Sequence, residues 1–510
     1  MTRWITSCAV RAGALGRAAC SGDNRVALTR WLFLRLLGAV YLIAFVSLWT
    51  QLDGLIGSRG ILPAAQFLDA VRGSREPLEA VRLVPTLAWL SPGDLTLHLL
   101  CGAGTAMALL LLAGIAPAAM LAGLWLSYLS LTAVGQSFLS FQWDILLLEA
   151  GFLAVFAAPP AWRSRAGRDA PPAAAVVWLF RWLVFRLMFS SGAVKLLSQD
   201  PVWRDLTALT YHYQTQPLPV WVSWHAHHLP DWFQVATCAL VFVIELAVPW
   251  LVFGPRRARF AAGAVFAGFQ ALIAATGNYT FFNLLTAILC LWLLDDAAWP
   301  AALRRRLGPI EEARPRGRWP SWLLGPVAAS LALLSWAPVS HLIPPLAGRP
   351  AWLSGIHRTL GPLRLANSYG LFAVMTTTRP EIIVEGSSDG EVWLPYEFAY
   401  KPGELTERPR FVAPHQPRLD WQMWFAALGS YRNHPWFLRF AQRLLQGSPD
   451  VLALLELNPF PEAPPRYIRG VLYEYRFSDP DTKRATGAWW ERRRLGLYCP
   501  ILTLPDTSSP

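Results

Sequence analysis

The chain has 510 residues, of which 54% are hydrophobic and only 15% are charged. Soluble domains carry about 25% charged residues, so the composition excludes an ordinary soluble enzyme and indicates an integral multi-pass membrane protein surrounded by membrane lipids. The formal net charge is +12, but no basic stretch alternates with aromatic residues as in a nucleic-acid groove, so we expect no nucleic-acid partner.

Nine apolar segments are candidates for membrane-spanning helices, because one span takes about 20 mostly apolar residues. They are residues 31–50, 97–114, 117–135, 138–158, 176–198, 232–253, 259–276, 278–295 and 322–344. A cleaved signal peptide does not explain the first segment, since 30 residues precede it and Arg35 interrupts it. We therefore predict a polytopic α-helical membrane bundle over residues 31–345, preceded by a basic cytoplasmic tail at residues 1–30.

The arginines between these segments indicate how the chain crosses the membrane. If the N-terminus lies inside, the cytoplasmic segments contain 17 arginines and the outer segments contain five. This excess agrees with the rule that positively charged loops stay in the cytoplasm. An odd number of spans then places the C-terminal region on the outer side of the membrane, in the periplasm or a lumen.

The region after the last apolar segment has the sequence pattern of a mixed soluble domain. Residues 381–400 alternate apolar and polar side chains around a Ser-Ser-Asp-Gly turn, which predicts a β-hairpin. Residues 420–457 have a helical pattern with Ser448 as a predicted N-cap, and residues 466–478 return to a strand pattern. We predict a β-rich outer domain over residues 346–510.

Ionisable side chains inside apolar spans are costly and are therefore candidates for function. With a helix rise of about 1.5 Å per residue, Glu149 matches Arg186 in depth, and Asp144 matches Lys195, on two consecutive antiparallel spans. Glu245 lies near the depth of the first pair. We interpret Glu149 and Arg186 as a structural ion pair, because a guanidinium binds a carboxylate through two hydrogen bonds and stays charged.

Lys195 is a candidate catalytic residue, with Asp144 as its partner. The chain has only three lysines, and a buried amine can lose its proton whereas a guanidinium effectively cannot. We therefore predict that Lys195 acts through its amine, as a base or nucleophile. The alternative is a structural pair with Asp144 or a side chain that reaches the membrane surface.

The outer loop at residues 199–231 is rich in histidine. Its four histidines are His212, His225, His227 and His228. They lie at no recognised metal-ligand spacing, and the tryptophans around them suit a membrane interface. We predict no metal and no other cofactor.

Nine segments of the chain resemble the lipase maturation factor family. In the C-terminal region they are NSYGLF (367–372), RPEIIVEGSSDG (379–390), PYEFAYKPG (395–403), APHQPRLDWQMWFAAL (413–428), NPFP (458–461) and PPRYIRGVLYEY (464–475). In the apolar part they are QWDILLLEAGFLA (142–154), FRLMFSSGAVKLLS (185–198) and TYHYQTQPLP (210–219). The resemblance implies an endoplasmic-reticulum membrane protein whose lumenal domain helps secreted lipases to fold and assemble as active dimers. In a bacterial source, the same chain would lie in the inner membrane.

The longest of these segments contains the candidate client-binding residues. Trp421, Trp424 and Phe425 share one face of a predicted helix, and Arg418 and Asp420 stand just before it. Asp420 is also a predicted helix cap. We predict that these five residues contact a client protein; the alternative is that the aromatic face packs into a core.

A shorter resemblance concerns Lys195. The segment SGAVKLLSQDPVW (191–203) is similar to the G-x-x-K-L…W pattern of the vitamin-K-dependent γ-glutamyl carboxylase group, whose catalytic lysine would fall on Lys195. The leading hypothesis is a membrane-anchored maturation factor for secreted, lipase-like clients, which need not be an enzyme. The alternative is a membrane enzyme of carboxylase-like ancestry that uses Lys195 on a lipid-soluble or peptide substrate.

Overall fold

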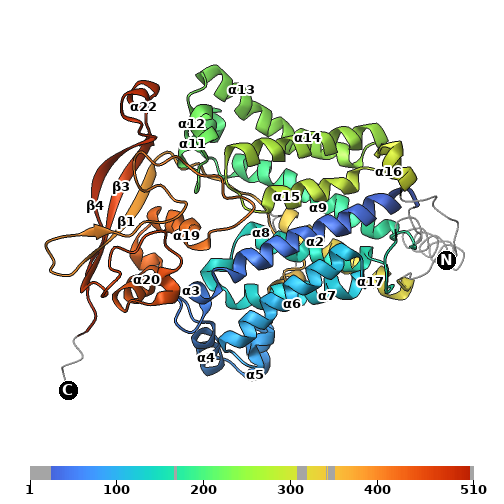
Figure 1. Ribbon diagram of the computed structural model, residues 1–510. Helices are drawn as coiled ribbons and strands as arrows, with labels where there is room; N and C mark the ends of the chain where they lie inside the picture. Colours follow the sequence, from blue (N-terminus) through green and yellow to red (C-terminus); the bar gives the residue numbers. More distant parts are fainter. Residues whose placement is uncertain (1–23, 166–168, 307–318, 341, 343–350, 506–510) are drawn as a thin grey trace, which may run out of the picture.

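The computed structural model describes residues 24–165, 169–306, 319–340, 342 and 351–505. Figure 1 shows a bundle of long helices and, at one end of it, a smaller part that contains a β-sheet. Most of the tail predicted at residues 1–30 lies outside the described residues, as does the end of the last predicted span.

Among the described residues, six helical segments are long and apolar enough to cross a membrane. They are α2 (Ala27–Trp49), α6 (Asp94–Ala113), α7 (Pro117–Val134), α9 (Ala174–Leu197), the run of α13 (Asp231–Phe242), η4 (Val243–Ala247) and η5 (Val248–Phe253), and α14 (Arg256–Thr276). The other three predicted spans fall on α8 (Gln142–Ala157), on α15 (Phe282–Leu289) with η6 (Cys290–Leu293), and on α17 (Ser321–Ser340). In the described part of the chain, these three do not meet the same length and composition. The protein thus has a membrane helical domain, whereas nine spans and their orientation stay predictions.

Short helices connect the long ones. Between α2 and α6 lie α3 (Leu52–Ile56), α4 (Ala64–Ser74) and α5 (Pro77–Leu83); between α9 and α13 lie α10 (Pro201–Arg204), α11 (Ala208–Thr215) and α12 (Trp221–His227). Two further short helices are α16 (Ala301–Arg306) and α18 (Ala351–Leu360). Figure 1 shows α3, α11 and α12 at the end of the bundle that meets the C-terminal region.

The C-terminal region contains a four-stranded antiparallel sheet in the order β2-β1-β3-β4. Its strands are β1 (Arg379–Ser387), β2 (Leu394–Pro395), β3 (Tyr467–Phe477) and β4 (Trp490–Leu502). The hairpin predicted at residues 381–400 is confirmed as β1–β2. In its turn, the Asp389 carboxylate accepts hydrogen bonds from the backbone N–H groups of Glu391 and Val392. The strand predicted at residues 466–478 is confirmed as β3. Sequence reasoning missed β4.

Four helices belong to the same region. They are α19 (Arg418–Ala427), α20 (Pro435–Leu445), α21 (Pro449–Leu452) and α22 (Pro480–Thr486). The first three confirm the helical pattern predicted over residues 420–457. The boundaries predicted for the two domains, 31–345 and 346–510, stay predictions.

Two predicted helix caps serve other contacts. Asp420 lies in the first turn of α19 and accepts the backbone N–H groups of Tyr400 and Lys401 at 2.9 and 3.0 Å. Ser448 does occupy the N-cap position of α21, but its hydroxyl donates to the carbonyl oxygen of Arg59 at 2.9 Å. Each side chain thus ties its helix to a neighbouring segment. It satisfies backbone groups of that segment, which need hydrogen-bond partners when they are buried.

Candidate functional site

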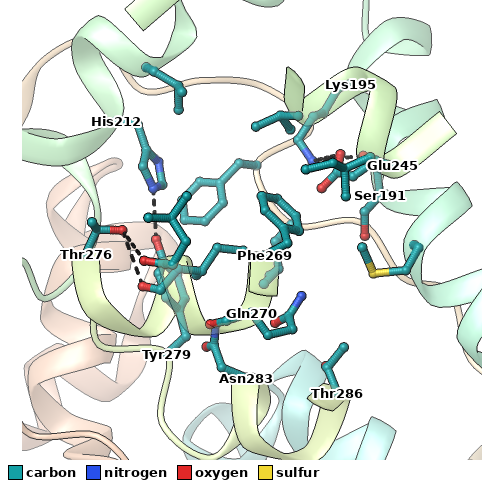
Figure 2. A pocket seen from close by; sticks show the side chains of 18 of the residues that line it. Ser191, Lys195, His212, Glu245, Phe269, Gln270, Thr276, Tyr279, Asn283 and Thr286 are labelled. Atoms are coloured by element: carbon teal, nitrogen blue, oxygen red, sulfur yellow. Dashed lines mark hydrogen bonds and ion pairs between the residues drawn. The ribbon is translucent and has the colours of Figure 1, made fainter. Parts of the chain in front are cut away.

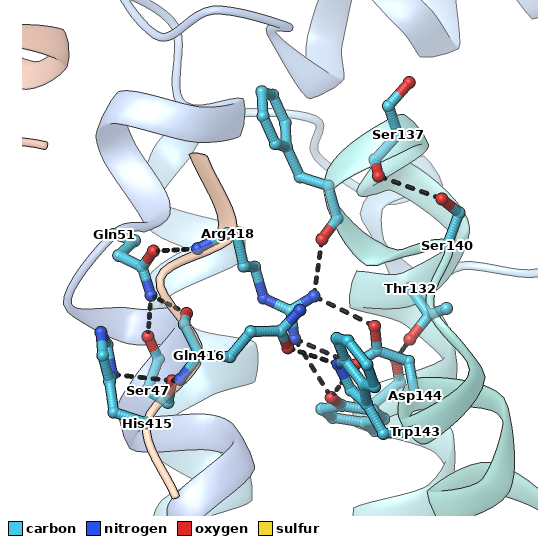
Figure 3. A network of polar contacts seen from close by, with 12 residues as sticks. Ser47, Gln51, Thr132, Ser137, Ser140, Trp143, Asp144, His415, Gln416 and Arg418 are labelled. Atoms are coloured by element: carbon cyan, nitrogen blue, oxygen red, sulfur yellow. Dashed lines mark hydrogen bonds and ion pairs between the residues drawn. The ribbon is translucent and has the colours of Figure 1, made fainter. Parts of the chain in front are cut away.

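Asp144, near the start of α8, binds Arg418 of α19 (Figure 3). The guanidinium donates to the two carboxylate oxygens at 2.9 and 3.0 Å and to the carbonyl oxygen of Phe138 at 2.6 Å. The Tyr128 hydroxyl donates to the same carboxylate at 2.5 Å. The expected pair of Asp144 with Lys195 is therefore wrong. The depth comparison looked for a cation only on other membrane spans, whereas the cation comes from Arg418 in the C-terminal region.

The segment before α19 is fixed to α2 and α8 by further hydrogen bonds (Figure 3). The Gln51 side chain donates to the Gln416 carbonyl oxygen at 2.8 Å and accepts the Arg418 backbone N–H at 2.8 Å. The Ser47 hydroxyl accepts the Gln416 backbone N–H at 2.9 Å, and the Trp143 indole donates to the Gln416 side-chain oxygen at 2.7 Å. Side chains of the helical bundle thus satisfy a backbone that would otherwise be buried without partners.

Glu149 and Arg186 lie in contact, and the C-terminal region completes their surroundings. Glu149 accepts the backbone N–H of Asn367 at 2.9 Å and the hydroxyl of Tyr369 at 2.7 Å. Arg186 donates to the Asn367 carbonyl oxygen at 3.1 Å. This ion pair therefore holds the NSYGLF segment as well as the two helices α8 and α9. Sequence reasoning did not foresee that second role.

Two other side chains join the same two parts of the molecule. Arg379, at the start of β1, donates to the carbonyl oxygens of Gln214 and Pro217 at 2.8 and 2.9 Å. Asn278, between α14 and α15, accepts the backbone N–H of Val412 at 2.9 Å. Burying polar groups is favourable only when they are hydrogen-bonded, and these contacts meet that requirement. The C-terminal region is consequently docked on the helical bundle through specific polar contacts.

Lys195, near the end of α9, pairs with Glu245 at 2.7 Å and also donates to the Ser191 carbonyl oxygen at 3.1 Å. Glu245 lies in η4, a π-helical turn. Pro249, four residues later, lacks the N–H that would bond to the Glu245 carbonyl oxygen, which accounts for the irregular turn. Gly192 permits the close approach of α9 and η4, since a Cβ there would lie 2.9 Å from the Cβ of Glu245.

A cavity of about 150 Å³ adjoins this ion pair, between α9, α13, α14 and α15 (Figure 2). Most of its lining side chains are apolar, and Lys195 and Glu245 lie at one side of it. At the end formed by α11, the Tyr279 hydroxyl donates to the Gln216 side-chain oxygen at 3.1 Å. Burial, reinforced by the charge of Lys195, lowers the pKa of His212 to about 4, so its imidazole is neutral at pH 7. Lys195 and the neutral His212 thus both line the cavity, whereas Asp144 does not.

The candidate client-binding residues lie mostly inside the molecule. Four are buried: Arg418, Asp420, Trp421 and Trp424. The Trp424 indole donates to the Thr215 carbonyl oxygen at 2.9 Å, and Trp421 packs against Trp143 with ring centroids 4.7 Å apart. Phe425 is the only one of the five that reaches the surface, with 38% of its area exposed. This burial favours the core-packing alternative for the other four.

The histidines of residues 199–231 are used in local packing. Burial lowers the pKa of His227 to about 4, and His228 contacts the Trp224 carbonyl oxygen through Nδ1 at 2.7 Å. Within the described residues, no group of three or more His, Cys, Asp or Glu side chains could hold a metal ion.

Comparison with known proteins covers both parts of the molecule. The family model of the lipase maturation factor transmembrane domain matches residues 28–301, and that of the lipase maturation factor C-terminal domain matches residues 365–500. The chain is 39% identical to lipase maturation factor 2 of Homo sapiens, over 94% of this chain and 83% of that protein. It is 36% identical to lipase maturation factor 1 of Homo sapiens, over 94% of this chain and 88% of that protein.

A bird relative gives the same result. The chain is 40% identical to lipase maturation factor 2 of Gallus gallus, over 94% of this chain and 82% of that protein. No solved structure matches the chain. The docking contacts join residues of both regions that the family models match. Because the two models and these relatives cover most of the chain, the chain belongs to the lipase maturation factor family.

Proposed function

We propose that this protein is a membrane-anchored maturation factor that assists secreted lipases on the outer side of the membrane. The names of its relatives, the two family models and the apolar helices support this function. We place it in the endoplasmic-reticulum membrane, or in the inner membrane of a bacterium. In this proposal residues 1–30 lie inside, residues 31–345 form the membrane bundle, and residues 346–510 face the lumen or periplasm.

The observation that carries this proposal is the docking of the C-terminal region on the bundle. Asp144 and Glu149 are charged groups within one apolar helix, α8, and such groups in a membrane bundle usually serve function. Both are occupied by the C-terminal region, Asp144 through Arg418 and Glu149 through Tyr369 and its neighbours. Because these two carboxylates bind the C-terminal region, they support a role in which the helical bundle holds the outer domain in a fixed position. They do not support a catalytic centre inside the membrane.

We propose the free edge of β4 as the surface that contacts the client. Within the described part of the chain, β4 pairs only with β3 and forms one edge of the sheet. Leu495, Leu497 and Ile501 on this strand are about half exposed. A strand edge of this kind binds an extended segment of another chain through backbone hydrogen bonds, and incompletely folded proteins expose such segments. The three arginines at residues 492–494 would oppose pairing between two copies of β4, because like charges repel.

Site-specific photo-crosslinking tests this surface. A photoreactive amino acid at Leu497 should capture a tagged secreted lipase that is produced in the same cell. The matched control is the same amino acid at Val392, an exposed apolar residue beside the opposite edge of the sheet. Capture from Leu497 and not from Val392 is the expected result. Equal capture from both positions, or none from Leu497, would contradict client binding at β4.

A membrane enzyme is the second candidate function, because Lys195 lines the cavity. Its amine is held by Glu245, however, so a base or nucleophile role would first require that pair to open.

A further inference from the structure

Three polar side chains in the cavity have hydrogen-bonding atoms without a partner. The Oε1 atom of Gln270, the Oδ1 atom of Asn283 and the hydroxyl of Thr286 are buried, and no hydrogen bond reaches them within the described residues. All three residues line the cavity, and Figure 2 shows Gln270 and Asn283 close together, with Thr286 on the same side of the cavity. Unpaired polar atoms inside a protein are uncommon and unfavourable. Their clustering therefore indicates that a molecule with hydrogen-bond donors occupies this space.

These side chains are held in position by the local structure. The Asn283 amide donates to the Gln270 carbonyl oxygen at 3.1 Å, which links α15 to α14 and leaves its own oxygen free. Thr286 follows Asn283 by three residues on α15, so both side chains lie on one helix face. Gln270 precedes the end of α14 at Thr276 by six residues, which is about 9 Å along the helix. The unpaired oxygen of Gln270 thus lies well inside the apolar segment formed by α14 and not at its end.

The exposed residues of the lining indicate that the cavity opens between α13 and α14. Among its lining residues, only Leu240 of α13 and Leu272 of α14 are strongly exposed, with 50% and 52% of their areas accessible. Elsewhere along its length, α14 packs closely against η5 instead of α13. Because α13 and α14 belong to apolar segments that can span a membrane, the molecules next to this opening are lipids.

We infer that this cavity binds a neutral lipid with a hydroxyl-bearing head group, which enters from the membrane between α13 and α14. A hydroxyl donates to an amide oxygen, so it satisfies Gln270 and Asn283. The hydrocarbon part contacts the apolar lining, and a cavity of about 150 Å³ accommodates one chain or ring, since a dry cavity of similar size holds a molecule such as benzene.

The charges of the lining favour a neutral ligand over a charged one. Glu245 is the only carboxylate among the lining residues, and Lys195 already neutralises it. An ammonium group would lack a free anion, and a phosphate would face the acceptor oxygens of Gln270 and Asn283. Burying an unpaired charge is strongly unfavourable. This inference needs no client protein and does not depend on the proposed maturation function.

Photolabelling of the purified full-length chain in phosphatidylcholine nanodiscs tests the inference. The probes are a monoacylglycerol and a sterol, each with a photoreactive group in its hydrocarbon part. The comparison probe is the same monoacylglycerol with its hydroxyls methylated. We expect a hydroxyl-bearing probe to label peptides of α13, α14 or α15. The methylated probe should label them about fivefold less, as expected for the loss of one hydrogen bond. Preference for one of the two hydroxyl-bearing probes identifies the lipid class.

Two substitutions, each with a matched control, locate the site. Leu272→Trp should block the opening and reduce labelling about tenfold or more, whereas Val265→Trp, on an exposed part of α14 outside the lining, should not. Thr286→Val removes one hydroxyl and keeps its shape, so it should weaken labelling several-fold, while Thr132→Val on α7 should have no effect. Equal labelling by the methylated probe, labelling unchanged by Leu272→Trp, or no labelling of these helices would overturn the inference.

Discussion

Replacing Arg418 with methionine tests whether a buried ion pair holds the C-terminal region on the membrane bundle. Methionine keeps much of the hydrocarbon volume of arginine but removes the guanidinium. Asp144, which is completely buried, would keep the Tyr128 hydroxyl and lose the charged donor that contacts both of its oxygens. The carbonyl oxygen of Phe138 would lose its guanidinium donor as well.

The expected loss of stability is large because both charges are buried. Arg418 and Asp144 are 1% and 0% exposed, and removing one partner of such a pair costs about 3–5 kcal/mol. Arg59→Met is the matched control, because Arg59 also pairs across the same boundary, with Asp450 of α21. That pair is 65% and 23% exposed, and surface ion pairs contribute about 0–1 kcal/mol.

Amide hydrogen exchange of the purified chain measures this loss where it should occur. The N–H groups of residues 413–428 exchange when the segment opens, so their protection reports the local free energy of opening. A loss of about 3–5 kcal/mol corresponds to exchange about 150- to 5,000-fold faster in Arg418→Met. In Arg59→Met the same amides should exchange at most about fivefold faster.

The double variant Arg418→Met with Asp144→Leu provides the decisive comparison. Replacing both members of a buried ion pair with apolar residues often restores stability, because no uncompensated charge is left. Protection of residues 413–428 should therefore recover substantially. If Arg418→Met exchanges no faster than Arg59→Met, or if the double variant is as labile as the single one, the ion pair does not fix the C-terminal region.

Three further predictions follow from the structure. Lys195→Arg keeps the positive charge beside Glu245 and should preserve lipase maturation. Lys195→Met leaves Glu245 uncompensated and should lower the amount of protein in the membrane. If the Lys195→Arg chain is normally abundant but inactive, the result favours the catalytic hypothesis instead. Burial raises the pKa of Asp420 from 3.8 to about 6, so above pH 6 its charged form lowers stability. Asp420→Asn, which can still accept the two N–H groups, should be up to about 3 kcal/mol more stable at pH 7. This gain in stability should shrink below pH 6 and disappear near pH 4, and chemical denaturation at each pH would measure it. Orientation is tested by reporter fusions, which should report inside, inside and outside at residues 165, 310 and 400, respectively; any reversed signal contradicts the proposed topology.

Local patterns in the sequence predicted the elements that depend on neighbouring residues. The β1–β2 hairpin could be predicted because Asp389 and Gly390 have the chemistry of a turn, and Gly390 does adopt a positive φ of 84°. β4 was missed because the arginines at residues 492–494 and Pro500 suggest an exposed loop. Its partner β3 is the preceding strand, but α22 lies between the two and their register is irregular, so the sequence shows no simple hairpin pattern.

The partners of the buried charges could be predicted only in part. Glu149 and Arg186 lie on consecutive helices, so helix geometry alone brings them to the same depth. Arg418 is 274 residues away from Asp144 in sequence, and only the docking of a separate domain brings them together. Lys195 meets Glu245 through a π-helical turn, which shifts side chains away from the positions that a regular helix would give.

The most direct test of the proposed function is the activity of a secreted lipase divided by its secreted mass. This ratio is measured in cells that produce the lipase with this chain, without it, and with its Arg418→Met variant. If the chain is a maturation factor that works through a docked outer domain, the ratio should be high with the parent chain and low in the other two cases. Equal ratios with and without the chain would contradict the account.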